Sequence, residues 1–131
     1  MRPYVHRIRY YECDGMGVTH HSNYLRIMEE ARLDLLEKAG FSYRDIEASG
    51  IISPVVKLSI RYVRPTVFDD EVTVETRACC ATAMRLKFEY VMKVRGEVVC
   101  TADNINCFIK GGKPQPIESC LPGLGEALGN Q

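Results

Sequence analysis

The chain has 131 residues, and its 17 Lys and Arg balance 17 Asp and Glu, so the formal net charge at pH 7 is zero. This length predicts one domain over residues 1–131, large enough to bury a stabilising core without disulfides. The balanced charge excludes an overall field that favours nucleic acid or an anionic membrane, although a local basic patch stays possible.

The first predicted strand covers residues 5–11, where apolar and polar side chains alternate loosely. From residue 23 to residue 39 the period changes to steps of three and four residues, which predicts one long amphipathic helix. Ser22 or Asn23 is expected to cap its start, and Gly40 to take the left-handed conformation just after its end. The apolar face of this helix consists of Tyr24, Ile27, Met28, Ala31, Leu35 and Ala39.

The sequence after this helix is mostly strand-like. Residues 42–48 form a short helical or irregular piece, which Ser49 and Gly50 end. Arg95-Gly96 indicates a two-residue hairpin turn, and the tail after Gly112, rich in proline and glycine, is expected to be mostly irregular. The predicted strands of this part cover residues 56–62, 71–75, 84–94 and about 98–109.

The predicted order is therefore one strand, one long helix and four antiparallel strands, an α+β fold. The alternation within the strands implies a sheet with one buried side. A helix of ~17 residues is ~25 Å long, and a curved sheet wrapped around it would bury its apolar stripe. The open edges of such a sheet favour pairing with a second copy, so we expect a homodimer or a homotetramer built as a dimer of dimers.

Two features bear on the cellular location. No apolar run reaches the roughly 18–20 residues that span a bilayer, and residues 1–6 lack the apolar segment of a secretory signal. We therefore expect a cytoplasmic protein without membrane insertion. The cysteines are scattered without C-x-x-C spacing, which favours reduced thiols over disulfides or a zinc site. The six are Cys13, Cys79, Cys80, Cys100, Cys107 and Cys120.

The segment 11–24, YECDGMGVTHHSNY, is the strongest candidate for chemistry. It leads from a predicted strand through a glycine-containing loop to a helix N-terminus, where unpaired backbone N–H groups and the helix dipole favour negative charge. Asp14 stands at the start of this loop, and the donors near His21 stand at the helix entry. A carboxylate facing such donors is the minimum equipment for acyl transfer to water, because one oxyanion donor commonly lowers the barrier by ~3–4 kcal/mol.

The pattern Y-x-E-x-D-x-M-G-V-x-H-H-x-N-Y of residues 10–24, followed by Glu29-Glu30-Ala31-Arg32, resembles the hotdog-fold acyl-CoA thioesterases of the 4-hydroxybenzoyl-CoA and Tol–Pal-associated type. The likeness continues through the I-R-Y-x-R-P segment at residues 60–65 and extends to about Ile109. It implies a hotdog fold, in which five antiparallel strands in the order 1-3-4-5-2 wrap around one central helix. It also implies active sites at a dimer interface.

The resemblance assigns roles to particular residues. Asp14 matches the essential carboxylate, which acts either as the nucleophile or as a general base, and both alternatives stay open. His21 matches the residue whose backbone N–H holds the oxyanion, and the histidine there is typical of the Tol–Pal-associated branch. Tyr10 is a further catalytic candidate. The expected substrate-binding residues are Gly17, Val18, Ser22, Asn23 and Tyr24.

The expected reaction is hydrolysis of a small or medium acyl-CoA, or of an acyl group on acyl carrier protein, without metal or organic cofactor. Asp14-Gly15 alone is an ordinary turn dipeptide, and neighbouring histidines cannot easily direct both rings at one metal ion. Asn104 and Asn106 are unusual on an apolar strand, which suggests that they face a polar interface or the substrate. A hydratase or dehydratase, or a non-catalytic acyl-thioester binding protein, are the alternative functions.

Overall fold

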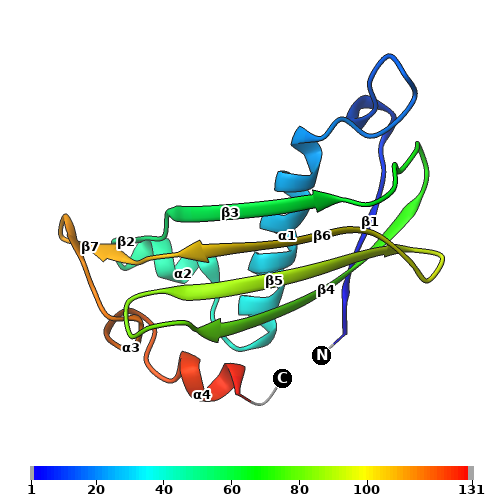
Figure 1. Cartoon of the computed structure of the whole chain (residues 1–131). Coiled ribbons are helices and arrows are strands. Elements are labelled where there is room, and N and C mark those ends of the chain that lie inside the picture. The colour runs from blue at the N-terminus through cyan, green and yellow to red at the C-terminus, as the bar shows by residue number, and fades with distance from the viewer. Residues whose placement is uncertain (1, 130–131) are drawn as a thin grey trace.

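The computed structural model describes residues 2–129. A five-stranded antiparallel sheet in the order β1-β4-β5-β6-β3 curves over one long helix, α1 (Figure 1). This arrangement confirms the predicted α+β class and the predicted order of the strands along the sheet. The strands are β1 (Tyr4–Arg7), β3 (Val55–Tyr62), β4 (Glu71–Cys80), β5 (Leu86–Val94) and β6 (Glu97–Asn106).

Helix α1 (Ser22–Lys38) confirms the helix predicted from the apolar period. Its buried face packs in one cluster with the buried face of β5, whose alternate residues from Leu86 to Val94 point inward. Gly40 has φ +94, which confirms the left-handed turn after the helix. The predicted cap is wrong, because the N-cap residue is His21, which has helical backbone angles and makes no side-chain capping bond.

The first strand is shorter than predicted. It ends at Arg7, and Tyr10–Glu12 form a 3-10 turn, η1, in place of the second half of the strand. The turn forms because the Glu12 carboxylate accepts a hydrogen bond from the Arg9 N–H at 2.6 Å, which draws the chain back on itself. The loop that follows η1 projects beyond the sheet at the start of α1 (Figure 1).

Strand β3 stands at one edge of the sheet and pairs only with β6. Its apolar residues were expected to lie on a buried side, but this is wrong for the chain by itself. Val56 and Leu58 are 45% and 44% exposed, and Tyr62 is 50% exposed. The curved sheet reaches past α1 at this edge, so this row of side chains is only partly covered by the described chain, with Tyr62 packing against Tyr24 at the start of α1.

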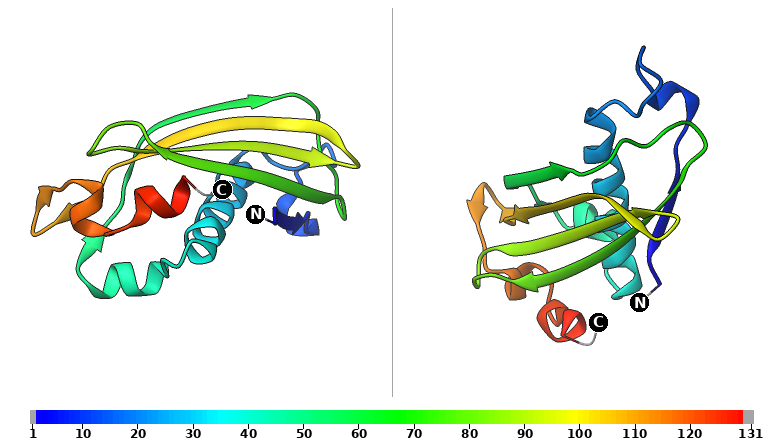
Figure 2. Two further views of the ribbon diagram at one scale, coloured as in Figure 1. Left: turned by 90° about the horizontal axis from the view of Figure 1, so that it is seen from below. Right: turned by 45° about the vertical axis from the view of Figure 1, so that its right-hand side comes forward.

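The C-terminal tail is not irregular as predicted. It forms α3 (Ile117–Cys120) and α4 (Leu124–Leu128), and α4 packs against β4 below the sheet (Figure 2). Four apolar side chains of the tail join the core because they close the end of the sheet that α1 leaves open. They are Ile117, Leu121, Leu124 and Leu128.

Short elements complete the structure. The predicted last strand is divided, because β6 ends at Asn106 and β7 (Ile109–Lys110) belongs to another sheet. In that separate small sheet, β7 pairs with β2 (Ile51–Ile52) and with β8 (Lys113–Pro114). Helix α2 (Tyr43–Ala48) precedes β2. The turn at Arg95-Gly96 is confirmed, because both residues have positive φ, of 50 and 80.

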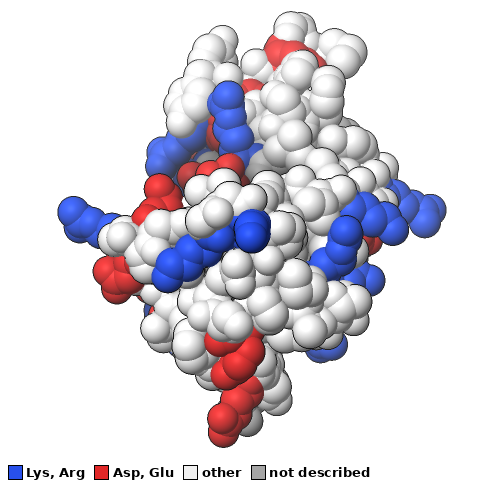
Figure 3. Space-filling model, turned by 90° about the vertical axis from the view of Figure 1, so that its left-hand side faces the viewer, with Lys and Arg blue, Asp and Glu red and all other residues white. Residues whose placement is uncertain are grey.

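The surface carries scattered charge. On the face at the β2 and β7 end, Lys and Arg stand in separate groups with Asp and Glu between and below them (Figure 3). No helix in the described part of the chain is both long and apolar enough to cross a membrane. The six cysteines are free thiols. A cytoplasmic location and a single domain over the whole chain stay predictions.

Leu124 tests whether the tail is part of the core. Its side chain is 0% exposed, so Leu124→Ala should lower the free energy of unfolding by about 2–5 kcal/mol through lost burial and a cavity. Urea unfolding of the whole chain measures this loss. Glu126→Ala, an exposed change on the same helix, is the control and should shift stability by less than about 0.5 kcal/mol. Equal stability of both variants would contradict the packing of α4.

Candidate active site

The loop between η1 and α1 is closed by its own backbone. Cys13 and Thr19 pair as an antiparallel bridge, and the Asp14 N–H donates to the Val18 carbonyl at 2.9 Å. The Gly17 N–H donates back to the Asp14 carbonyl at 3.0 Å. Gly17 has φ +79, a conformation that glycine adopts without steric cost. These bonds hold Asp14 at the neck of a tight loop rather than in a mobile segment.

The Asp14 carboxylate is only partly used by the protein. Its Oδ1 accepts a hydrogen bond from the Met16 N–H at 2.8 Å, an Asx-type contact that orients the side chain. Its Oδ2 accepts no hydrogen bond from any residue within 2–129. Asp14 is half-buried, so this second oxygen is open to a ligand. The group is thus oriented and still has a free acceptor.

The start of α1 has a free backbone donor. The His20 N–H donates to Glu12, and the N–H groups of Asn23 and Tyr24 donate to the carbonyls of His20 and His21. The His21 N–H, in contrast, has no acceptor among the described residues. It lies at the positive end of a 17-residue helix, where an anionic atom is stabilised by the helix dipole.

Glu12 connects the elements around this site. It is 4% exposed, and its carboxylate bonds to His6 Nε2 at 2.9 Å as well as to the Arg9 N–H. Its backbone carbonyl accepts from the His20 N–H at 2.8 Å and from Asn23 Nδ2 at 2.9 Å. A buried carboxylate needs such partners, because an unpaired one costs several kcal/mol. Glu12 therefore ties β1 to both sides of the loop.

The end of β3 reaches the same helix start. The Tyr62 hydroxyl donates to the His21 carbonyl at 3.4 Å, and the Tyr62 ring packs edge-on against the ring of Tyr24 at 5.3 Å. Tyr24 in turn bonds through its hydroxyl to Thr66 Oγ1 at 2.9 Å, and burial raises its pKa, so this hydroxyl stays protonated. Contacts from the end of β3 therefore also hold the N-terminal residues of α1 in place.

The predicted site residues differ in their exposure to solvent and in their hydrogen-bond partners. Asn23 and Tyr24 are 6% and 3% exposed and are engaged in the protein's own hydrogen bonds. Ser22 is exposed and bonds through Oγ to the His20 ring at 2.8 Å. Tyr10 is 78% exposed and packs edge-on against Phe68. The structure therefore brings Asp14, Gly17 and Val18 together through backbone bonds and places the His21 amide at the start of α1, and the catalytic and binding roles of all these residues stay predictions.

Sequence reasoning missed three contributors. Glu12 belonged to the recognised pattern, but nothing in the sequence showed that it is buried at the centre of the loop contacts. Tyr62 and Thr66 come from segments about 40 residues away, so only the fold brings them to the helix start. Among residues 2–129, no group of three or more His, Cys, Asp or Glu is arranged to hold a metal ion.

Several proteins that this chain resembles are named as thioesterases or thioester hydrolases. The sequence profile of the Thioesterase-like superfamily matches residues 8–128. The structure of a DHNA-CoA thioesterase from Staphylococcus aureus is 34% identical, with a TM-score of 0.91 over 98% of this chain and 89% of that chain. A hypothetical protein from Thermus thermophilus, TT1821, is 32% identical, with a TM-score of 0.90 over 99% and 98%.

One further similar protein has a named activity. The acyl-CoA thioester hydrolase YbgC of Escherichia coli O6:H1 is 30% identical over 79 residues, which cover 60% of this chain and 57% of that protein.

Glu12→Gln tests the central role of the buried carboxylate. The change keeps the shape but removes the charge that faces His6, so the free energy of unfolding should fall by about 1–3 kcal/mol. The His20 amide, which donates to the Glu12 backbone carbonyl, should also exchange its hydrogen faster, because the turn that the carboxylate holds is loosened. Urea unfolding and hydrogen exchange measure the two effects. Glu47→Gln on the exposed side of α2 is the matched control, and a Glu12→Gln protein that behaves like it would refute the role.

Proposed function

The chain belongs to the thioesterase-like superfamily and is a thioester hydrolase, and from this premise we propose that it hydrolyses an acyl-CoA thioester to the free acid and coenzyme A. The observation that supports the proposal best is the combination of two unsatisfied groups. They are Oδ2 of Asp14 and the N–H of His21 at the start of α1, neither of which has a hydrogen-bond partner among residues 2–129. A base or nucleophile together with an oxyanion donor is what acyl transfer to water requires.

Two routes use these groups. In the first, Asp14 accepts a proton from water while the water oxygen attacks the thioester carbonyl carbon. In the second, an Asp14 oxygen attacks that carbon, the C–S bond breaks, and water then hydrolyses the resulting anhydride. Both routes place negative charge on the carbonyl oxygen, which the His21 N–H is proposed to stabilise. Both release the coenzyme A thiolate, which takes up a proton.

Coenzyme A is the proposed thiol rather than acyl carrier protein. The named relatives from Escherichia coli and Staphylococcus aureus carry coenzyme A thioesters in their names. Both routes consume only water, so we propose that the enzyme uses no separate cofactor. The proposed site of action is the cytoplasm, where the six free thiols would stay reduced.

Asp14→Asn tests the chemistry. The asparagine Oδ1 can still accept from the Met16 N–H, so the loop should keep its shape while basicity and nucleophilicity are lost. The rate of thiol release from a panel of acyl-CoAs should fall by about 10²–10⁴-fold. Asp45→Asn, on exposed α2, is the control and should keep the wild-type rate. Thiol release by Asp14→Asn at the wild-type rate would remove Asp14 from the mechanism.

We further propose that the enzyme is a homodimer formed through the β3 edge, either alone or as half of a homotetramer. The outer edge of β3 has backbone groups that no other described strand pairs, and its exposed row contains Val56, Leu58 and Tyr62. Such an edge is a template for pairing with another strand. Pairing with the same edge of a second copy satisfies the backbone and covers the apolar row in one contact.

Leu58→Asp tests this contact. A charge in the middle of the proposed interface should shift the protein toward a smaller species in analytical ultracentrifugation. The monomer should stay folded, because Leu58 is 44% exposed in the single chain. Val5→Asp is the control, since Val5 is 49% exposed on β1 at the opposite edge of the sheet and should leave the assembly unchanged. An unaltered mass for Leu58→Asp would rule out the β3 interface.

A further inference from the structure

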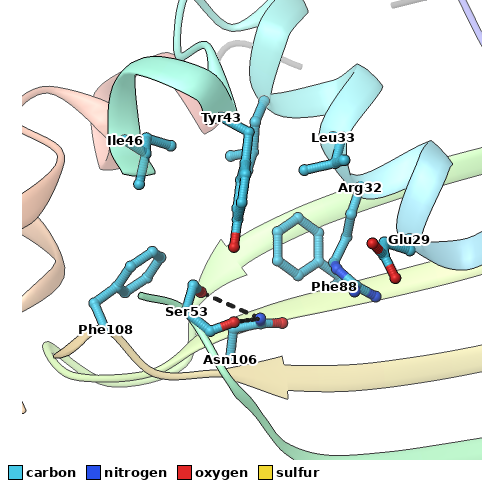
Figure 4. A pocket seen from close by; sticks show the side chains of 10 residues that line it. Glu29, Arg32, Leu33, Tyr43, Ile46, Ser53, Phe88, Asn106 and Phe108 are labelled. Atoms are coloured by element: carbon cyan, nitrogen blue, oxygen red, sulfur yellow. Dashed lines mark hydrogen bonds between the residues drawn. The ribbon is translucent and has the colours of Figure 1, made fainter. Parts of the chain in front are cut away.

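Helix α1 carries polar side chains on two sides. On one side, Arg32 and Asn106 line a cavity of about 200 Å³ between α1, α2 and the sheet (Figure 4). Arg32 Nη1 donates to Asn104 Oδ1 at 3.3 Å, and Asn104 donates through Nδ2 to Asn106 Oδ1. The two asparagines of β6 therefore belong to a buried polar cluster beside this cavity. On the side of β1, Glu30 of α1 instead faces His6, and this second cluster contains two carboxylates.

The His6 ring of β1 lies between these two carboxylates. Its Nε2 is 2.9 and 3.1 Å from the two oxygens of Glu12, and its Nδ1 is 3.5 Å from Glu30 Oε2. The His6 side chain is only 14% exposed, and Glu12 is buried. Since Glu12 belongs to η1 and Glu30 to α1, this one ring connects β1 to both elements.

The arrangement of these groups indicates the charge of the ring. A neutral imidazole has one N–H and one lone pair, so one of its nitrogens would direct a lone pair at a carboxylate oxygen. In an imidazolium, both nitrogens carry a hydrogen and both can be directed at a carboxylate. Among residues 2–129, His6 is the only basic side chain within 4.0 Å of either Glu12 or Glu30. A buried carboxylate needs such a counter-charge.

Tyr4 holds the far end of this cluster. Its hydroxyl donates to Glu30 Oε2, the oxygen that His6 Nδ1 faces. Burial and the Glu30 carboxylate raise the pKa of Tyr4, so this hydroxyl stays protonated and remains a donor. Asp34, on the next turn of α1, adds negative charge near Tyr4, and its own partner is Lys38 at 2.5 Å. The groups around His6 are thus acidic or neutral, which favours a positive ring.

Glu12 links the His6 ring to the candidate catalytic groups. Its backbone carbonyl accepts from the His20 N–H at 2.8 Å and from Asn23 Nδ2 at 2.9 Å, and these two residues flank His21 in the sequence. Asp14 follows Glu12 by two residues. A displacement of Glu12 would therefore shift both the candidate carboxylate and the candidate oxyanion donor.

We propose that His6 is a positioning residue for the hydrolysis, and that it acts as an imidazolium held between Glu12 and Glu30. The inference rests on the proposed function. The two ion pairs keep Glu12 in one orientation, and Glu12 keeps Asp14 and the His21 N–H in their relative positions. His6 takes no part in bond breaking.

Nitrogen NMR of histidine-labelled wild-type protein tests the charge of the ring. At neutral pH both His6 ring nitrogens should have a directly bonded hydrogen, and His6→Gln identifies the signals by removing them. A His6 ring with only one protonated nitrogen would overturn the proposed imidazolium. This measurement does not depend on enzymatic activity.

His6→Phe tests the positioning role, because it keeps a ring and removes both nitrogens. For whichever of acetyl-, hexanoyl- and benzoyl-CoA the wild type hydrolyses fastest, kcat per folded protein should fall about 10- to 100-fold. KM should stay within about twofold, since a group that only positions the reacting groups leaves substrate binding unchanged. His6→Gln can donate to one carboxylate and should lose less activity than His6→Phe.

Arg7→Met is the matched control. Arg7 is the next residue of β1, and its guanidinium also pairs with two carboxylates, those of Asp69 and Glu71. Its side chain is 48% exposed, and these ion pairs do not involve Glu12. The change should leave both kcat and KM at the wild-type values. An equal loss of kcat in Arg7→Met and His6→Phe would show a general effect of charge on β1 and would contradict the specific role.

A double variant tests whether His6 acts through Glu12. Adding His6→Phe to Glu12→Gln should lower kcat by less than about twofold further, because the link is already broken. A further loss as large as that of His6→Phe alone would mean that His6 acts independently, and would refute the inference.

The remaining outcomes separate the inference from the function beneath it. If His6→Phe lowers stability but keeps the wild-type kcat per folded protein, His6 is only structural and the inference is wrong. If KM rises while kcat is unchanged, His6 affects binding and the positioning role is again wrong. If the wild type hydrolyses none of the acyl-CoAs, the proposed function fails and the positioning role falls with it.

Discussion

One face of α1 packs against the concave side of the sheet, where Ile27, Met28 and Leu35 share a buried cluster with Phe88 and Met92 of β5. Each such side chain contributes about 1.5–3 kcal/mol when it leaves water, so this contact is the main source of stability. It also sets the positions of the candidate catalytic loop and of the cavity. The helix is about 25 Å long, and its N-terminus meets the loop while its middle lines the cavity.

Two carboxylates on either side of Cys13 illustrate how environment assigns roles. Glu12 is buried, and both its side chain and its carbonyl are used to join β1, the loop and α1. Asp14 is half-buried, and one of its oxygens has no hydrogen-bond partner in the described part of the chain. The first group is rigid because burial demands partners, and the second is available because it lies in a loop that the first one supports. We therefore assign a structural role to Glu12 and propose the chemical role for Asp14.

In the isolated chain, the β3 edge leaves apolar side chains uncovered, and the polar cavity leaves hydrogen-bond donors unpaired among residues 2–129. An apolar row on β3 faces solvent, and the Arg32 guanidinium inside the fold has N–H groups for which residues 2–129 provide no acceptor. We propose that a second copy of the chain covers the first.

Sequence alone determined the elements that depend on near neighbours. The helix of 22–38, the turn at Arg95-Gly96 and the left-handed Gly40 follow from periods and backbone preferences within a few residues. The loop before the helix indicated Asp14 as the candidate carboxylate, and the resemblance to hotdog thioesterases added its family role and the order of strands. The tertiary structure decided which contacts form between residues that are far apart in the sequence. The bonds of Arg32 to Tyr90 and Asn104 join residues 58 and 72 positions apart, and the tail helices are held by the core they close. Such contacts leave no periodic signal, because burial and hydrogen-bond partners exist only once the sheet has curved around the helix.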